Sequence, residues 1–279
     1  MRGGLWYHLG HKVMSTETAF LGASTVFGKN WLGHRYFDYL INRENFKLTF
    51  GKSFRKMVYL DTAVANGPAA TRKDPEGDAR TTRYLINHLA DIKPELTIFV
   101  TTCDMLEPTA NEDTPTIKQS DDPYVQNRID MYEAVNRQYG RVLNVHLPEI
   151  ATKEPGFSEL IDTLFKPGKS TKPLPFAPNE YHQFYFPDLI MKDVEVCVPL
   201  GIPAIIPASV PLTTAEVVRA IAPEQIKRLR EPREDDPHGS NRTTRHAWQW
   251  WHEDPGYMAS KGDHKVLLQH YLRPELLGT

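Results

Sequence analysis

Short apolar segments alternate with helical segments along most of the chain, and this order constrains the fold more than any single motif. Residues 18–21, 57–60 and 96–100 are largely apolar runs of strand length. Residues 82–92 carry apolar side chains at helical spacing, and 123–139 opens with a proline after two aspartates. Strands that alternate with helices predict a parallel sheet covered on both faces. We therefore expect an α/β fold with a doubly wound parallel sheet.

Other segments extend the same alternation. They are a helix over 29–42, a strand over 46–50, a polar loop over 68–77, a strand over 141–147, a helix over 157–165, a strand over 204–206 and a helix that opens at 213–216. The last of these begins with Thr213 and Glu216, the pattern of a capping box.

The composition of the sequence changes near residue 224. Charged residues dominate 228–236, and an aromatic group (Trp248, Trp250 and Trp251) precedes a final helix over 263–272. The aromatic group either anchors this part to the main domain or stacks on a ligand ring. We expect three parts: an N-terminal extension (1–17), the sheet domain with interleaved substrate-pocket segments (18–222) and a small appended helical lobe (223–279).

The composition argues against several classes of partner. In 279 residues, 33 lysines and arginines nearly balance 35 aspartates and glutamates, which gives no electrostatic basis for binding nucleic acid or an anionic membrane. No apolar run approaches the ~18 residues of a membrane span, and the opening lacks the apolar core of a secretory signal. Two cysteines, Cys103 and Cys197, suit a reducing compartment. We therefore expect a cytoplasmic protein.

A glycine-containing turn follows the first predicted strand. Gly22 and Gly28 fit the outer positions of a Gly-x-x-Gly-x-x-Gly turn, whereas Thr25 occupies the middle one. A strand, a glycine turn and a helix bind anions through backbone N–H groups and the positive end of the helix. Gly22, Ser24, Thr25 and Gly28 are therefore predicted to contact a pyrophosphate, as in a Rossmann-like NAD(P)-binding domain.

Tyr124 and Arg128 stand four residues apart on a predicted helix and so share one face. A guanidinium beside a phenol favours the phenolate and lowers its pKa. Thr102, at the end of the strand over 96–100, could hold a substrate oxygen in line. The trio suits proton exchange at a substrate oxygen while a hydride moves at the adjacent carbon. The alternative is that the pair forms part of a solvated helix face.

Five landmarks follow one another in a characteristic order. They are the turn over 22–28, Val58-Tyr59-Leu60-Asp61-Thr62-Ala63, Phe99-Val100-Thr101-Thr102-Cys103-Asp104, Tyr124-x-x-x-Arg128 and Val145-His146-Leu147-Pro148. In this order the chain resembles the extended short-chain dehydrogenases/reductases, the NAD-dependent nucleotide-sugar epimerase/dehydratase family, over roughly residues 18–222.

The resemblance implies roles for individual residues. It makes Thr102, Tyr124 and Arg128 catalytic, and it adds Ala63, Pro148, Glu149, Tyr124 and Arg128 to the cofactor site. Cys103 and Asp104 occupy the positions of an acid pair that expels water from the sugar in dehydratase members. Only half of that pair is kept, and the resemblance assigns both residues to the substrate site. Gln183 and Tyr185 fall where the family lines its substrate pocket, with core packing as an equal alternative for Tyr185. Family members often dimerise through the tyrosine helix, which makes a homodimer an expectation.

Three departures from the family pattern leave two functions open. Arg128 replaces a lysine and cannot pass a proton onward. Thr25 places a side chain where the diphosphate would press closest, and the stretch between the second and third predicted strands is short. One hypothesis is an NAD(P)-dependent oxidoreductase, epimerase or dehydratase acting on a nucleotide sugar. The other is a catalytically degenerate dinucleotide-binding module that senses or scaffolds.

The remaining expectations concern the cofactor and metals. The second predicted strand is followed by Gly51-Lys52-Ser53-Phe54-Arg55, without a carboxylate, so Lys52 is assigned to the cofactor site and the choice between NAD and NADP leans slightly toward NADP. The eleven histidines form no compact ligand spacing, and no metal site is predicted. Cys103 is interpreted as an inert buried thiol rather than a reactive one.

Overall fold

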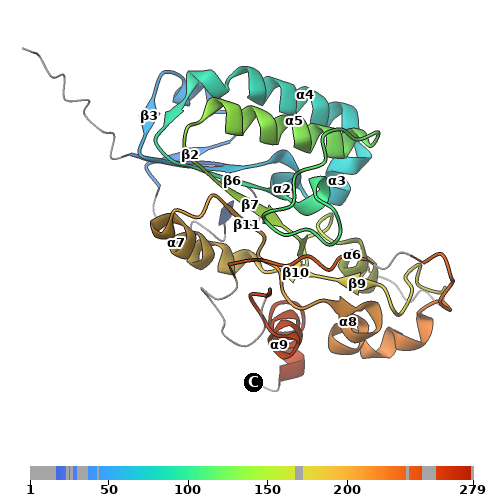
Figure 1. The fold of residues 1–279 in the computed structure, drawn as a ribbon. Helices are drawn as coiled ribbons and strands as arrows, with labels where there is room; N and C mark the ends of the chain where they lie inside the picture. Colours follow the sequence, from blue (N-terminus) through green and yellow to red (C-terminus); the bar gives the residue numbers. More distant parts are fainter. Residues whose placement is uncertain are drawn as a thin grey trace, which may run out of the picture.

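The computed structural model describes residues 17–22, 25, 28–29, 37–42, 44–166, 172–236, 239–246 and 256–277. A central sheet lies between α4 and α5 on one face and α7 on the other, and a smaller lobe containing α6, α8 and α9 packs beside it (Figure 1). The aromatic group at 248–251 falls outside the described residues. No helix of the described chain is long and apolar enough to cross a bilayer.

The central sheet has six strands, all parallel, in the order β2-β1-β4-β6-β7-β11. Their bounds are β1 Thr18–Leu21, β2 Tyr39–Ile41, β4 Lys56–Leu60, β6 Thr97–Thr102, β7 Val142–Leu147 and β11 Ala204–Ile205. The predicted doubly wound α/β sheet is therefore confirmed. The strand order reverses between β1 and β4, and open sheets of this kind bind ligands outside the carboxyl ends of the strands at such a switch point.

The second strand lies elsewhere than predicted. Residues 39–41, assigned to a helix, form β2, whereas Phe46–Thr49, assigned to a strand, form the 3-10 helix η1. Asn42 and Asn45 explain the difference, because their side chains exchange hydrogen bonds with each other's backbone N–H groups and turn the chain after β2. The apolar alternation that suggested a strand is broken by Leu48, which is 66% exposed.

The predicted polar loop over 68–77 is largely helical. It contains α3 (Pro68–Lys73) and the start of α4 (Pro75–Asn87), preceded by α2 (Thr62–Asn66). Both prolines occupy the first turn of a helix, where the missing N–H has no partner to lose. Gly67, at φ 89°, separates α2 from α3, and an added Cβ there would lie 2.5 Å from the carbonyl oxygen of Gly156. Ala69 donates a hydrogen bond to the same oxygen at 2.9 Å.

Residues of β1, β4 and β6 alternate between two hydrophobic clusters. On β6, Phe99 packs in the cluster that contains Met131 and Val135 of α5 (Pro123–Gln138). Its neighbours Ile98 and Val100 pack in the cluster that contains α7 (Ile190–Leu200). Both faces of the central strands are therefore covered, as expected for a parallel sheet.

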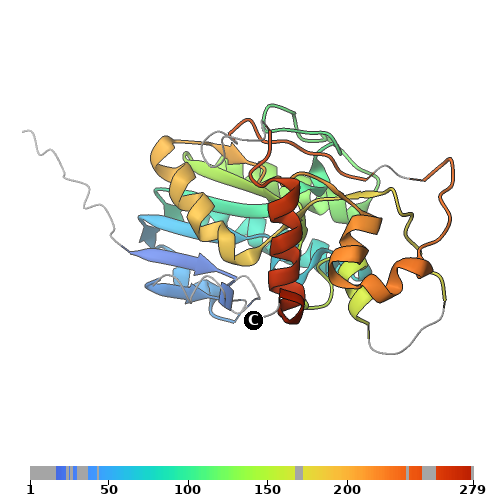
Figure 2. The same cartoon turned by 90° about the horizontal axis from the view of Figure 1, so that it is seen from below.

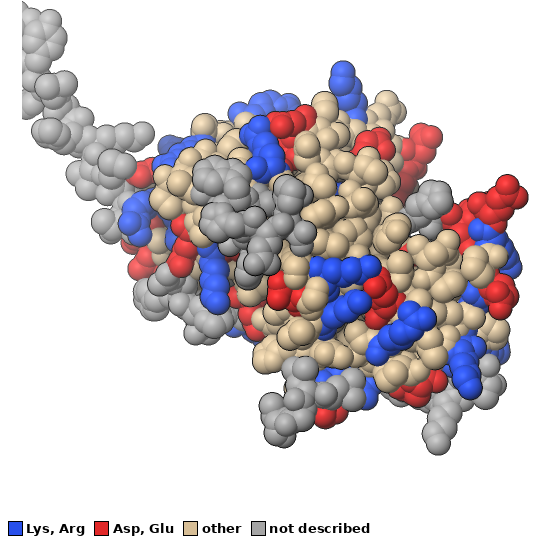
Figure 3. Space-filling model, turned by 60° about the horizontal axis from the view of Figure 1, so that its bottom comes forward, with Lys and Arg blue, Asp and Glu red and all other residues tan. Residues whose placement is uncertain are grey.

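The smaller lobe has its own core. It brings together α6 (Glu159–Phe165), α8 (Thr214–Ile221) and α9 (Lys261–Leu272), and α9 lies between α7 and α8 when the molecule is seen from below (Figure 2). The domain boundary predicted between residues 222 and 223 stays a prediction. The core of the lobe contains residues from both sides of this boundary. On the face drawn in Figure 3, acidic and basic residues are interspersed, in keeping with the nearly balanced charge.

Short elements complete the described chain. They are β3 Ser53–Phe54 paired with β5 Lys93–Pro94, β8 Glu149–Ile150 paired with β10 Phe184–Tyr185, β9 Tyr181–His182 paired with β12 Leu212–Thr213, and the 3-10 helices η2 Leu89–Asp91, η3 Cys103–Met105, η4 Pro187–Leu189, η5 Pro223–Arg228 and η7 Pro274–Leu277.

His264 holds α9 against the strands of the lobe. Its Nε2 accepts a hydrogen bond from the backbone N–H of Phe184 at 3.3 Å, so its Nδ1 carries the proton and donates to the carbonyl of Val210 at 2.9 Å. This arrangement requires a neutral imidazole. Burial accordingly lowers the pKa of His264 to about 4.

We expect the free energy of unfolding to fall as the pH is lowered from about 6.5 toward 4. In this range His264 takes up a proton in the unfolded protein but stays neutral in the folded protein. The contribution is at most about 1.4 kcal/mol per pH unit. Denaturant titrations of the wild type and His264→Gln at several pH values should give a shallower acid slope for the variant. His146, whose pKa is also lowered to about 4 by burial, titrates in both proteins and cancels. Equal slopes would refute the assignment.

Candidate active site

A cleft of about 830 Å³ lies at the carboxyl ends of β1 and β4, where the strand order reverses. Its volume is typical of small-molecule sites. One wall comes from the glycine turn and the end of β2, and the other from α2, α3 and α4. The lining includes Gly22, Thr25, Asn42, Thr62, Asp78 and Arg80. The structure thus has a groove at the place where the sheet topology calls for one.

Gly22 is required at the start of the turn. It has φ 101°, a conformation that side chains disfavour, and a Cβ would lie 3.0 Å from the side chain of Leu60 on β4. Its N–H donates to the carbonyl of Ile41 at 2.9 Å and joins the turn to β2. Gly28 is buried at the start of the following helical residues. Ser24, predicted to contact a pyrophosphate, lies outside the described residues.

Thr25 closes the turn with its own side chain. Its hydroxyl donates to the carbonyl of Gly22 at 2.7 Å and accepts from the N–H of Gly28 at 3.1 Å. This is the geometry of a helix N-cap. The single hydroxyl proton is used within the turn, so in this conformation Thr25 orders the backbone rather than offering a free donor to a ligand.

Tyr124 meets Thr102 and Asp104 beyond the end of β6. The phenolic oxygen of Tyr124 lies 3.4 Å from Oγ1 of Thr102 and donates a hydrogen bond to Oδ2 of Asp104 at 2.7 Å. Tyr124 is only 1% exposed. Asp122 caps α5 by accepting from the N–H of Tyr124 at 2.9 Å, which fixes where the phenol enters the site. The structure therefore brings together three residues that the sequence assigned to one site.

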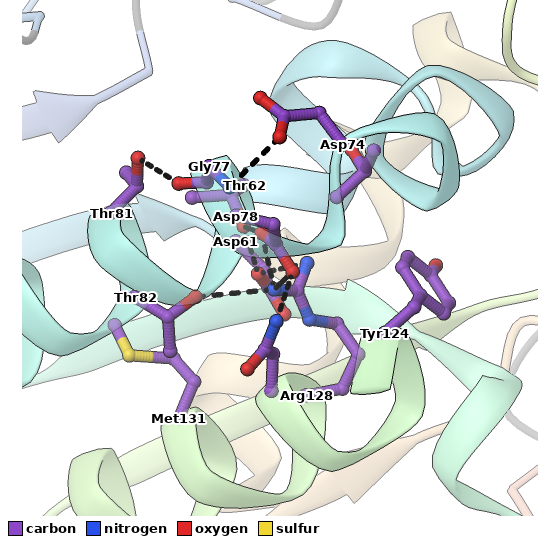
Figure 4. Close-up of polar contacts among 12 residues, drawn as sticks. Asp61, Thr62, Asp74, Gly77, Asp78, Thr81, Thr82, Tyr124, Arg128 and Met131 are labelled. Atoms are coloured by element: carbon purple, nitrogen blue, oxygen red, sulfur yellow. Dashed lines mark hydrogen bonds and ion pairs between the residues drawn. The ribbon is translucent and has the colours of Figure 1, made fainter. Parts of the chain in front are cut away.

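Arg128 lies beneath the ring of Tyr124 and is paired with two carboxylates (Figure 4). Its guanidinium carbon is 5.3 Å from the ring centroid, so both side chains face the same way, as their spacing predicted. Nη1 lies 2.9 Å from Asp61, and Nη2 contacts both oxygens of Asp78 at 2.7 and 2.8 Å. Arg128 is completely buried, at 0% exposure. The cation is thus shared between β4, α4 and α5.

Hydroxyl and amide groups complete this buried network. Thr101 donates to Asp61 at 2.7 Å, while Thr62 and Asn127 donate to Asp78 at 2.6 and 2.7 Å. The contact between Nη1 of Arg128 and Asp61 is close but poorly aligned for a hydrogen bond. Nε and Nη1 have no hydrogen-bond partner among the described residues.

Electrostatics oppose the predicted activation of the tyrosine. Burial raises the pKa of Tyr124 well above its usual value, and the nearby Asp104 carboxylate raises it further, against the smaller lowering effect of Arg128. Burial also raises the pKa of Asp61 despite Arg128. For Arg128, burial lowers the pKa, but Asp61 and Asp78 outweigh burial and leave it raised. The expectation of an acidified phenol is therefore wrong: Tyr124 is a protonated phenol at neutral pH.

Arg72 of α3 covers Tyr124 from the other side. Its guanidinium carbon lies 4.0 Å from the ring centroid, Nη1 donates to Asp122 at 2.5 Å, and Nη2 lies 3.4 Å from Oδ1 of Asp104. The Arg72 side chain is 41% exposed, so it stands between the phenol and solvent.

Other predicted cofactor residues are distributed differently. Ala63 is buried in α2, in the same small cluster as Tyr124. Lys52 lies at the amino edge of the sheet, where Nζ donates to the hydroxyl of Tyr39 at 3.1 Å. Its assignment depended on a second strand ending at residue 50, and the real one ends at Ile41. Pro148 separates β7 from β8, and Glu149 accepts from Ser158 at 2.8 Å and contacts His182 at 2.8 Å.

The predicted substrate residues other than Asp104 are internally bonded. Cys103 donates to the carbonyl of His146 at 3.1 Å, and burial raises its pKa to about 12, which fits the inert interpretation. Gln183 is buried and bonded to Ser209 and Arg242. Tyr185 donates to Asp193 at 2.5 Å within the hydrophobic core.

Asp61, Asp78 and Arg72 are site residues that the sequence did not reveal. Asp61 ends the apolar run of β4, and a buried Arg128 demands a counter-charge. The need for a counter-charge could have suggested a carboxylate near Arg128. No local sequence pattern, however, identifies Asp78 as the partner of Arg128 or Arg72 as a neighbour of Tyr124. Within the described residues no group of three or more histidine, cysteine, aspartate or glutamate side chains could hold a metal ion.

Removing the buried cation should destabilise the fold strongly. Arg128→Met leaves Asp61 and Asp78 buried without a counter-charge, and we expect a loss of about 3–5 kcal/mol in unfolding free energy. The matched control is Arg72→Met, which breaks partly exposed ion pairs and should cost about 1 kcal/mol or less. Denaturant titration measures both. Comparable losses in the two variants would show that the buried network is not the stabilising one.

Thr25 should act through its hydroxyl. Thr25→Val removes the acceptor for Gly28 at nearly constant volume and should cost about 1 kcal/mol of stability, whereas Thr25→Ser should stay within a few tenths of a kcal/mol of the wild type. Denaturant titration of the three proteins checks the order. A valine variant as stable as the serine variant would contradict the capping role.

Comparison with known proteins identifies solved structures of the same fold, at low sequence identity. No protein-family model and no curated protein matches the chain. UDP-N-acetylglucosamine 4-epimerase from Methanobrevibacter ruminantium, solved with UDP-N-acetylmuramic acid, matches with a TM-score of 0.66 and 11% identity over 95% of this chain and 100% of that one.

Two further solved structures agree. MoeE5 in complex with UDP-glucose and NAD has a TM-score of 0.64 and 11% identity over 93% of this chain and 99% of its own. The dTDP-4-dehydrorhamnose reductase of Yersinia enterocolitica has a TM-score of 0.63 and 9% identity over 92% and 99%. The chain therefore has the fold of the extended short-chain dehydrogenases/reductases, the family that its motif order resembles.

Proposed function

We propose that the chain binds a nicotinamide dinucleotide in the groove beside β1 and β4 and reduces a carbonyl group of a nucleotide-linked sugar. The observation that carries this proposal is the meeting of the Tyr124 and Thr102 hydroxyls, 3.4 Å apart. Proton transfer at a substrate oxygen needs a donor and an orienting hydroxyl in hydrogen-bond reach of one point.

The residues of the groove suit a dinucleotide. Gly22 opens the turn at φ 101° and lines the groove, where backbone N–H groups ahead of a helix suit a diphosphate. MoeE5, which shares the fold, was solved with NAD and UDP-glucose. Gly22, Thr25 and Gly28 would hold the diphosphate end, and Ala63, Tyr124 and Arg128 the nicotinamide end.

The state of Tyr124 favours reduction over oxidation. A bound nicotinamide supplies or accepts hydride. With its pKa raised by burial and by Asp104, Tyr124 keeps its proton at neutral pH and is suited to donate it from Oη to a carbonyl oxygen. Thr102 would hold that oxygen. Epimerases and dehydratases of this type begin with oxidation of an alcohol, which needs the tyrosine as a base, so the site suits a reductase better.

The choice between NAD and NADP rests on the end of β2. Asn42 stands there, without the carboxylate that would accept from a ribose 2′-hydroxyl. The following residue, Arg43, lies outside the described residues. We therefore keep the slight preference for NADP, and base it on Asn42 instead of Lys52. A homodimer through α5 and a cytoplasmic location also remain proposals.

A second candidate function is dinucleotide binding without turnover. Two observations favour it: Tyr124 is almost completely buried, and the charge of Arg128 is taken up by Asp61 and Asp78. Such a module would sense or scaffold with a nucleotide.

Tyr124→Phe separates the two functions. Calorimetric titration with NADH and NADPH measures binding, and the loss of reduced nicotinamide in the presence of a dTDP- or UDP-4-keto sugar measures turnover. We expect the variant to lose about 10²–10⁴-fold in turnover with cofactor affinity nearly unchanged, because only the proton donor is removed.

The matched control is Tyr132→Phe, two turns further along α5, which should leave turnover unchanged. A fully active Tyr124→Phe variant would refute the assignment. A wild type that binds the dinucleotide but oxidises none of it with these keto sugars would support the second candidate.

A further inference from the structure

We propose that Asp104 is the proton relay between Tyr124 and solvent, and that Arg72 is the positioning residue that holds Asp104 in place. The proposal rests on the proposed function, since a relay serves catalysis only if Tyr124 gives up its proton. It concerns the step after donation, when the phenolate must be protonated again.

The route through Arg128 is closed. A guanidinium cannot be deprotonated in a protein, so it cannot pass a proton as an ammonium can. Arg128 is completely buried, and the side chains of Asp61 and Asp78 that hold it are only 1% and 2% exposed. Among the described residues, no group on this side of the phenol both bonds to its oxygen and reaches solvent.

The route through Asp104 is open. The Tyr124 hydroxyl has two side-chain neighbours among the described residues, Thr102 at 3.4 Å and Asp104 at 2.7 Å. Thr102 is buried, whereas the side chain of Asp104 is 33% exposed. Asp104 is therefore the group that touches the phenol at one oxygen and can exchange protons with water.

Arg72 fixes the orientation of Asp104. Its Nη2 faces Oδ1 of Asp104 at 3.4 Å, which leaves Oδ2 for the phenol. Its Nη1 bonds to Asp122 at 2.5 Å, and Asp122 caps the helix that carries Tyr124. The charged groups around the phenol are thus Asp104, Asp122 and Arg72 on the solvent side, with Arg128 and its two carboxylates beneath.

The proton balance of the step is simple. The Oη–H bond of Tyr124 breaks as its proton goes to the carbonyl oxygen of the substrate. The Asp104 carboxylate then takes a proton from solvent and passes it to the phenolate, which restores the phenol and the carboxylate. Nothing is oxidised or reduced in this return.

A second tyrosine–aspartate pair in the chain serves as a comparison for Tyr124 and Asp104. Tyr185 donates to Asp193 at 2.5 Å, as Tyr124 does to Asp104, but both Tyr185 and Asp193 are buried. The two tyrosine–aspartate pairs thus differ mainly in whether the carboxylate reaches solvent. Proton exchange at Tyr124 should be fast and exchange at Tyr185 slow.

Hydroxyl exchange tests the relay without cofactor or substrate. In protein labelled with ζ-¹³C tyrosine, the deuterium isotope shift of each ζ-carbon reports exchange of its hydroxyl proton with D2O. We expect Tyr124 to exchange at least about tenfold faster than Tyr185, and Asp104→Asn to slow Tyr124 by a similar factor while leaving Tyr185 unchanged.

Two further variants give the experiment its controls. Asp104→Glu keeps a carboxylate and should restore part of the exchange rate. Arg72→Gln should slow Tyr124 less than Asp104→Asn does, because it disturbs only the position of Asp104. An unchanged or faster Tyr124 exchange in a folded Asp104→Asn protein would overturn the relay.

The test of the relay can fail or succeed independently of the test of the proposed reductase function. Exchange that depends on Asp104 in a protein without turnover would leave the relay standing and remove the reductase. In an active protein, Asp104→Asn should slow later turnovers more than the first, since the return of the proton passes through Asp104, whereas its donation depends on Asp104 only through the pKa of Tyr124. Turnover with exchange and steady-state rate both independent of Asp104 would reject the relay alone.

Discussion

The pairing of Arg128 with Asp61 and Asp78 is the interaction on which the site depends. It ties α5 to the end of β4 and to α4, three elements far apart in the sequence, at the point where the groove begins. Removing this cation would leave two buried carboxylates without a counter-charge. This network therefore joins the groove wall at Asp78 to the helix that carries Tyr124.

The same contact changes what the tyrosine can do. A lysine beside the phenol could favour the phenolate, but the charge of Arg128 is already shared with two carboxylates. Burial and Asp104 then dominate and keep Tyr124 protonated. A site of this composition is poor at starting an oxidation and well suited to donating a proton. The direction of the proposed reaction follows from electrostatics that the motif alone does not contain.

The sequence predicted the features that local patterns control. Strand alternation gave the parallel sheet, and the spacing of Tyr124 and Arg128 gave a shared helix face. The second strand was misplaced because side-chain hydrogen bonds between Asn42 and Asn45 end β2 in a way that apolar periodicity does not register. Asp78 was missed because its contact with Arg128 spans 50 residues and has no local signature.

The contact between Gly67 and Gly156 links the two halves of the molecule. The backbone of Gly67 lies so close to the carbonyl of Gly156 that no side chain fits between them, and Ala69 is hydrogen-bonded to the same carbonyl. The loop before α6 is thus joined directly to the start of α3. Because α3 carries Arg72, the packing of the lobe reaches the helix whose side chain covers Tyr124.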